Sequence, residues 1–130
     1  MSFIKDLTNV CRVAYRSGAN RARSDAELRR RKVELKNRYR RLISDAAHKY
    51  NRASKRILDR QIEQGKALQR SLINQEISES QAIKISHAQE AQANHDLICL
   101  IRRHTEELEQ LNAKYDQELA SLRRSPLSAR

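Results

Sequence analysis

The sequence is poor in the residues from which a compact globular core is built. Tryptophan is absent, Phe3 is the single phenylalanine, and only 38% of the 130 residues are hydrophobic while 33% are charged. A compact domain of this length buries more than half of its unfolded surface around one core. The composition therefore argues against such a domain and is instead typical of long helices rich in Arg, Glu, Gln, Ala and Leu.

Glycine and proline are almost missing as well. The two glycines, Gly18 and Gly65, stand alone, and the single proline is Pro126. A phosphate-cradling loop, a nucleophile elbow and a zinc-protease helix all need motifs that this sequence lacks. We therefore expect an all-α, non-enzymatic chain with no catalytic residues, no cofactor and no small-molecule substrate.

Cysteine is equally scarce, because Cys11 and Cys99 are the only two and lie far apart in sequence. Their spacing suggests neither a disulfide framework nor a zinc site. His95 and Cys99 would share one helix face, but nothing marks the further ligands that a soft metal needs, so no metal site is expected. The longest apolar run, Leu97 to Ile101, is too short to cross a bilayer. We expect an intracellular, cytoplasmic protein without a secretory signal, with a basic mitochondrial presequence before Ser24 as the alternative.

Positive charge is what the sequence has in excess, and nearly all of it lies in the first half. Residues 1–60 hold 18 of the 27 Lys and Arg and six of the 16 Asp and Glu, a net charge of +12, whereas residues 61–130 sum to −1. A surface this basic attracts polyanions such as nucleic acid, an anionic membrane or an acidic protein. Net charge alone does not choose among them.

The apolar residues of segment 2–16 recur at helical spacing, which predicts a short N-terminal amphipathic helix. Residues 17–20 are expected to break it, and Ser24 with Glu27 matches a capping box at which a long helix would begin. The apolar side of residues 2–16 either packs onto the long helix, which we favour, or lies on an anionic membrane surface. Pro126 cannot continue a helix. The predicted organisation is a short helix and turn in residues 1–20, a long helical coiled-coil region in residues 21–124 and a flexible tail in residues 125–130.

From Asp25 onward the apolar positions follow an eleven-residue period, which gives 3.67 residues per turn and favours straight or weakly right-handed packing. One row contains Leu28, Tyr39, Tyr50 and Leu72, and a neighbouring row contains Leu35, Ile57 and Leu68, with Leu42 between the two. Acidic residues four positions before basic ones, such as Glu27 with Arg31 and Glu34 with Arg38, support helix by about 0.2 to 0.5 kcal/mol each.

The last third of the chain changes to a seven-residue period, which is typical of a left-handed coiled-coil seam. We expect the apolar residues of both periods to form the seam of a homo-oligomer, because one narrow stripe on a long helix buries too little surface for a stable monomer. The seam residues are Leu28, Leu35, Tyr39, Leu42, Tyr50, Ile57, Leu68, Leu72, Ile101, Leu108, Tyr115, Leu119 and Leu122.

The polar stretch of residues 74–96 leaves two arrangements open. An unbroken helix over residues 25–124 would be about 150 Å long. A turn near residues 74–80 would instead give two arms of similar length that pack as an antiparallel hairpin. No glycine or proline forces a turn in this stretch, and its potential N-caps are Ser78, Ser80, Ser86 and Asn94. We favour the elongated helical hairpin.

Basic residues also repeat every eleven positions and form two rows along the first half. The rows are Arg30, Arg41 and Arg52, and Arg38, Lys49 and Arg60. Such rows either follow a phosphate backbone or form a solvated face. We expect a coiled-coil scaffold that oligomerises and presents its basic half to an acidic protein. The alternative is a sequence-independent nucleic-acid-binding protein that uses residues 21–60.

Overall fold

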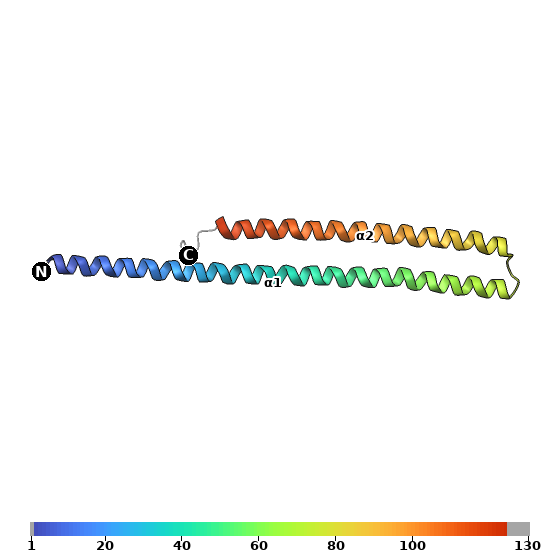
Figure 1. Cartoon of the computed structure of the whole chain (residues 1–130), viewed down its shortest axis with the longest axis horizontal. Coiled ribbons are helices and arrows are strands. Elements are labelled where there is room, and N and C mark those ends of the chain that lie inside the picture. The colour runs from blue at the N-terminus through green and yellow to red at the C-terminus, as the bar shows by residue number, and fades with distance from the viewer. Residues whose placement is uncertain (1, 125–130) are drawn as a thin grey trace. The chain divides into compact units, whose positions relative to one another are not determined.

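The protein is an all-α helical hairpin, as the composition predicts. The computed structural model describes the backbone of residues 2–124 and the side chains of residues 19–124. It contains helix α1, Ser2–Ile73, and helix α2, Glu79–Arg124, which pack against each other (Figure 1). The chain divides into two units: unit 1 comprises residues 1–40 and 113–130, and unit 2 comprises residues 41–112. Each unit contains a part of both helices.

The turn between the helices occupies residues 74–78, inside the region where the sequence predicts it. At the end of α1, the Glu76 N–H donates to the Ser71 carbonyl at 2.9 Å and the Gln75 N–H donates to the Leu72 carbonyl at 3.1 Å. This pair of bonds is a Schellman motif, whose left-handed residue is usually glycine. Here Gln75 takes that conformation, with φ of 59°. The helix therefore ends without the glycine that normally marks such a position in a sequence.

A capping box starts α2 on the other side of the turn. The Ser78 hydroxyl accepts from the Gln81 N–H at 3.2 Å, and the Gln81 side-chain oxygen accepts from the Ser78 N–H at 2.9 Å. Two N–H groups that have no partner inside the helix are thereby satisfied. Of the four potential N-caps in the sequence, Ser78 is the one that begins α2.

Gln75→Gly is expected to raise the free energy of unfolding by about 1 kcal/mol, because glycine adopts positive φ without the steric clash of a Cβ atom. Urea denaturation followed by circular dichroism measures the change. Gln69→Gly is the matched control, since Gln69 is exposed inside α1 and glycine there should destabilise by about 1 kcal/mol. Equal destabilisation by both substitutions would contradict the left-handed conformation at Gln75.

The predicted helix break at residues 17–20 is wrong, because α1 runs without interruption from Ser2 to Ile73. A lone glycine inside a helix costs only about 1 kcal/mol relative to alanine, and no proline stands nearby to remove a backbone donor. Ser24 consequently lies inside α1 and caps nothing. The favoured packing of residues 2–16 onto the long helix and the alternative membrane contact both concern side chains outside those described, and the tail of residues 125–130 is outside the described residues altogether.

The core between the helices is thin and built largely from alanine. In unit 2 the buried hydrophobic residues are Ala46, Ala82 and Ala93, and in unit 1 they are Leu35 and Tyr39. Alanine lets two helix backbones approach closely but buries little apolar area. Ten large hydrophobic side chains among those described remain exposed. Each unit therefore gains only modest stability from the contact between its own two helices.

The eleven-residue period describes the packing of unit 2 on both helices. On α1, Tyr50, Ile57 and the other row members of this unit are buried or half-buried. On α2 the corresponding line is Ala82, Ala93 and His104, and the His104 ring stacks on Tyr50 with 4.7 Å between centroids. Two packed helices must share a period for their contact lines to stay in register. The heptad predicted for α2, Ile101, Leu108, Tyr115 and Leu122, departs from this line in unit 2 at Ile101, which is 50% exposed. In unit 1 its member Tyr115 does face α1, because it packs on Tyr39.

Candidate interaction surfaces

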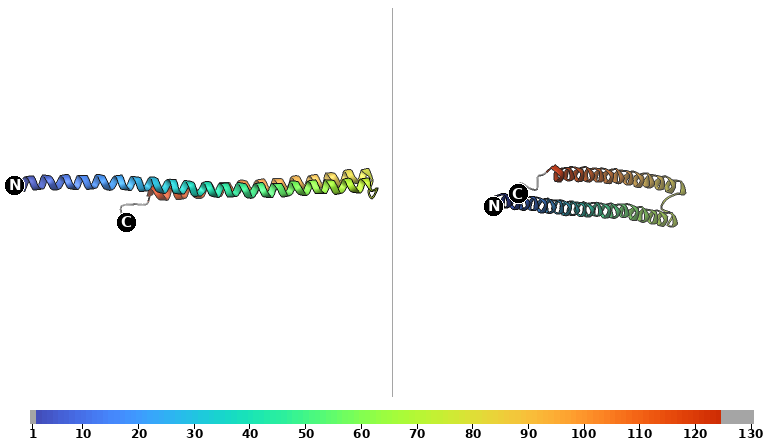
Figure 2. Two further views of the ribbon diagram at one scale, coloured as in Figure 1. Left: turned by 90° about the horizontal axis from the view of Figure 1, so that it is seen from below. Right: turned by 60° about the vertical axis from the view of Figure 1, so that its left-hand side comes forward.

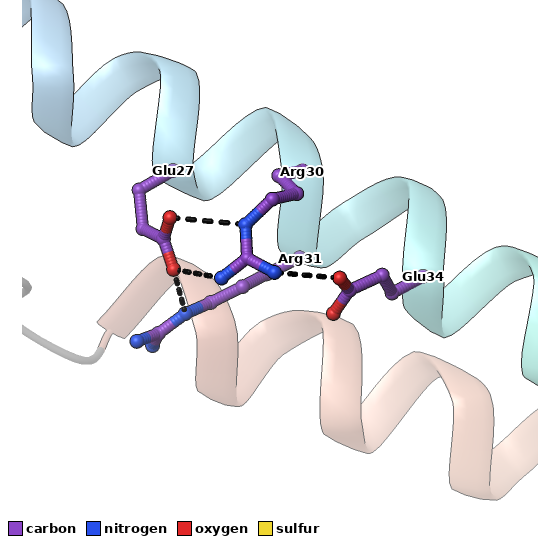
Figure 3. A network of polar contacts seen from close by, with 4 residues as sticks. All are labelled: Glu27, Arg30, Arg31 and Glu34. Carbon is purple, nitrogen blue, oxygen red and sulfur yellow. Dashed lines mark hydrogen bonds and ion pairs between the residues drawn. The ribbon is translucent and has the colours of Figure 1, made fainter.

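The basic segment of α1 in unit 1 is organised by short-range ion pairs. Figure 3 shows Arg30 between two carboxylates: its Nη1 lies 2.7 Å from Glu34 Oε1, and its Nε donates to Glu27 Oε2 at 3.0 Å. Arg31 Nε donates to Glu27 Oε1 at 3.2 Å. The hydrogen bond from Arg30 is the main reason why the pKa of Glu27 is lowered, and the same bond raises the pKa of Arg30. The pairs of Arg30 are largely exposed and that of Arg31 is half-buried, so these pairs fix side-chain direction more than they add stability.

An aromatic and ionic cluster joins α1 to α2 in unit 1. Tyr39 packs edge-to-face on Tyr115 with 5.4 Å between ring centroids, and its hydroxyl donates to Glu118 Oε1 at 3.0 Å. The other Glu118 oxygen pairs with Arg38. Burial of the ring, and secondarily the bond to Glu118, raises the pKa of Tyr39. The cluster combines the buried aromatic contact of this unit with a charge pair at its edge.

A second ion pair across the helices lies in unit 2. Arg60 pairs with Asp96, whose other oxygen accepts from the Gln92 amide at 2.9 Å. Lys49 and Glu107 stand one eleven-residue period from these two positions on their respective helices and line one groove together. The eleven-residue period thus places a basic flank of α1 beside an acidic flank of α2, a relation that Arg38 and Glu118 repeat in unit 1.

The six residues predicted to bind polyanions fall into two groups. Arg30, Arg38 and Arg60 form ion pairs, yet their side chains remain 54% to 58% exposed. Among the described residues no ion pair forms at the other three, which are exposed: Arg41, Lys49 and Arg52. Exposed ion pairs contribute only about 0 to 1 kcal/mol. All six cations are therefore accessible to a polyanion, although the six do not belong to one unit.

Charge is distributed very differently in the two units. In unit 2, residues 41–73 of α1 carry eight basic and three acidic residues, but residues 79–112 of α2 carry three basic and six acidic residues, which nearly cancels the excess. In unit 1, residues 19–40 hold nine basic and three acidic residues, and residues 113–124 add three basic and two acidic. The positive potential is therefore concentrated in unit 1. Other basic residues of this segment, such as Arg21, Arg23 and Arg29, fall inside the predicted range of residues 21–60 but belong to no eleven-residue row of three cations.

Unit 1 also leaves part of its basic helix without a neighbour. Arg31, Leu35 and Arg38 line a groove with Glu118 and Leu122 of α2, close to the end of α2 at Arg124. No described helix lies beside the preceding, N-terminal part of α1 (Figure 1). A basic helix segment without a neighbouring helix is open to contact from several directions.

Most residues of the predicted oligomer seam are buried or half-buried within the single chain. In unit 1, Leu35 and Tyr39 are buried and Leu28, Tyr115, Leu119 and Leu122 are half-buried. In unit 2, Tyr50, Ile57, Leu68, Leu72 and Leu108 are half-buried. Leu42 and Ile101 are the exceptions at 41% and 50% exposed. Whether any of them also contacts a second chain stays a prediction, and residues already covered within the chain have little area left for it.

The described side chains were expected to form no metal site, and only a pair of potential ligands comes together among them. Cys99 Sγ lies 3.6 Å from His95 Nε2, which brings the two potential soft ligands together on one helix face. No set of three His, Cys, Asp or Glu side chains converges within residues 19–124. No helix in the described part of the chain has a stretch long and apolar enough to pass through a membrane. The surfaces that remain are the charged and apolar sides of the helices.

The sequence matches no family model, and neither a curated protein nor a solved structure matches it.

Proposed function

We propose that this chain is a non-enzymatic interaction protein that self-associates through its long helices and presents the basic segment of residues 19–40 to an acidic protein partner. The observation that carries the proposal is the contrast between a thin core and a large exposed apolar surface. Only five hydrophobic side chains among those described are buried, and ten large ones are exposed.

Self-association follows from the energetics of two-helix contacts. A helix of this kind is stabilised mainly by packing of its apolar face, and two helices with an alanine-rich contact supply little of it. A contiguous exposed apolar patch commonly marks an interface, and ten large hydrophobic side chains among those described are available to form one. Association with further copies supplies the missing burial without any enzymatic site.

The choice of an acidic partner rests on the charge of unit 1. Nine basic residues within residues 19–40 favour association with a polyanion through long-range attraction. The second candidate is nucleic acid, which is favoured by the exposed basic rows along α1 and would be bound without sequence preference. The three tyrosines whose side chains are described offer little stacking surface for bases, since Tyr39 is buried, Tyr50 stacks on His104 and Tyr115 packs on Tyr39. Binding to an acidic protein surface requires only positive charge on this chain and no stacking surface, so an acidic protein is the partner that we favour.

Thermal melting at several protein concentrations tests the self-association. Mass action makes the Tm of an oligomer rise with concentration, and a hundredfold increase should stabilise it by about 2.7 kcal/mol. For a chain of this length the Tm should then rise by roughly 5 to 10 °C. Circular dichroism at 222 nm, in cells of different path length, measures this. A folded chain whose Tm does not change with concentration would contradict the proposal.

A further inference from the structure

One stripe along α1 loses all its charged residues where unit 2 begins. The stripe takes every third or fourth residue and contains only charged side chains from Asp25 to Arg40, but none from Ile43 to Ile73. Ile43, Leu58 and Ile62 on this stripe are exposed large hydrophobic residues. An uninterrupted run of uncharged positions, most of them exposed, is unusual in a chain with a net charge of +11.

A matching stripe runs along α2 in the same unit. It takes every third or fourth residue from Ile83 to Asn112 and contains Glu90 as its single charged residue. On this stripe Ile83 is 58% exposed, Ile101 is 50% exposed and Leu108 is half-buried. Ile101 and Leu108 of the predicted heptad therefore lie on this stripe.

The two stripes lie on the same side of unit 2. Gln61 continues the contact line of α1, because it lies eleven residues after Tyr50 and is half-buried. Successive residues of an α-helix are 100° apart, so Arg60 and Ile62 lie on opposite sides of Gln61. On α2 the contact line passes through Ala93. Asp96 and Leu97 come three and four residues after Ala93 and therefore lie on opposite sides of this line. Because Arg60 pairs with Asp96, the charged flanks share one side of the hairpin, and the uncharged flanks must share the other.

A groove opens on this uncharged side near the turn. Its walls are Leu68 and Leu72 of α1 and Ala82 and Ile83 of α2, with Glu79 and Ser86 at its edge. It exposes core residues of unit 2 that the two helices do not cover by themselves. A further apolar surface laid over this side would close the groove and bury the exposed isoleucines.

We infer that the uncharged side of unit 2 is the docking surface for a second copy of this chain, so that two hairpins form a four-helix bundle. The inference rests on the self-association in the proposed function and assigns it to a surface other than the sequence-predicted seam. An acidic protein or nucleic acid would find almost no cation here, whereas a second copy brings an equally uncharged surface and no like-charge repulsion. The pairing also keeps the basic residues 19–40, which belong to unit 1, free for another partner.

Substitutions on the two stripes test the inference. Ile62→Glu and Ile101→Glu each place a charge in the proposed contact and should weaken self-association roughly a hundredfold, because an unpaired charge is costly to bury. Both side chains are exposed in the single chain. Ile62→Gln, which removes apolar area without adding charge, should weaken association roughly tenfold and covers the case in which a glutamate variant does not fold. Light scattering after size-exclusion chromatography gives the mass, and circular dichroism reports the helix content.

Val33→Glu and Ala67→Glu are the matched controls. Val33 is as exposed as Ile62 but belongs to unit 1, and Ala67 is exposed on the charged side of unit 2. Both should keep the wild-type mass. If Ile62→Glu, Ile101→Glu and Ile62→Gln also keep it, self-association stands but the surface assigned to it is wrong. If the unsubstituted chain is a monomer, the proposed function and this inference are overturned together.

Discussion

Ala93→Arg is expected to destabilise the helical hairpin by about 3 to 5 kcal/mol and to remove most of its cooperative melting. Ala93 is 4% exposed and lies on the contact line of α2 in unit 2. A long charged side chain at this position must either force the helices apart or bury an unpaired charge. The thin core offers no other apolar contact to compensate. Thermal melting followed by circular dichroism measures the loss.

Ala91→Arg is the control for this substitution. Ala91 lies two residues earlier in the same helix but is exposed, so the same change should alter the free energy of unfolding by less than about 0.5 kcal/mol. The pair separates an effect of packing from an effect of added charge or altered helix propensity. Similar melting curves for the two variants would mean that Ala93 is not in a helix contact.

Removal of three cations from unit 1 is expected to weaken polyanion binding far more than removal of three from unit 2. Arg21, Arg23 and Arg29 replaced together by glutamine should lower affinity for a polyanion on the order of a hundredfold at 50 mM salt. Binding through about six contacts to a duplex should itself weaken on the order of a thousandfold between 50 and 200 mM salt. The triple substitution should flatten that salt dependence by roughly three contacts. Fluorescence anisotropy with labelled DNA and labelled polyglutamate provides both affinities.

Arg41, Lys49 and Arg52 replaced together by glutamine form the comparison. They also carry three positive charges, but unit 2 is almost electrically balanced because its part of α2 is acidic. The effect should be at least tenfold smaller than in unit 1. Equal effects of the two triple variants would show that binding depends on net charge and not on residues 19–40. Tight binding to DNA with none to polyglutamate would favour the nucleic-acid alternative.

Sequence reasoning predicts most of the architecture because helix periodicity is a local property. The scarcity of glycine, proline and aromatic residues predicts an all-α chain, and the structure confirms a helical hairpin. The eleven-residue rows of Tyr50 and Ile57 predict the packed line of α1 in unit 2. The turn is less visible in the sequence because Gln75, not glycine, adopts the left-handed conformation that ends α1.

Two sequence predictions fail because they depend on what lies outside the local segment. The helix break at residues 17–20 does not occur, since the small penalty of Gly18 is outweighed by continuous helix on both sides. The seven-residue period predicted for α2 also fails to describe its contact with α1 in unit 2. The contact line there includes Ala82, Ala93 and His104, which are only weakly hydrophobic. Their importance comes from close approach to α1 and from stacking on Tyr50, and both require knowledge of the partner helix.

Ion pairs between the two helices cannot be predicted from the sequence, because they too depend on the position of the partner helix. Helix spacing predicts that Glu34 pairs with Arg38, but Glu34 contacts Arg30 and Arg38 contacts Glu118 on α2. Likewise, the acidic residues of α2 offset the basic residues of α1 in unit 2, but this can be predicted only once the antiparallel register of the helices is known. Candidate polyanion-binding residues therefore shift from rows along the whole basic half to the segment of residues 19–40.

Sedimentation equilibrium of the full chain at micromolar concentration tests self-association most directly. A thin alanine-rich core and an uncharged apolar side on unit 2 lead us to expect a helical species of at least twice the mass of one chain. Dilution should convert it to single chains with loss of helix content, because folding and association are coupled. A monodisperse, fully helical monomer over the same concentration range would contradict the account.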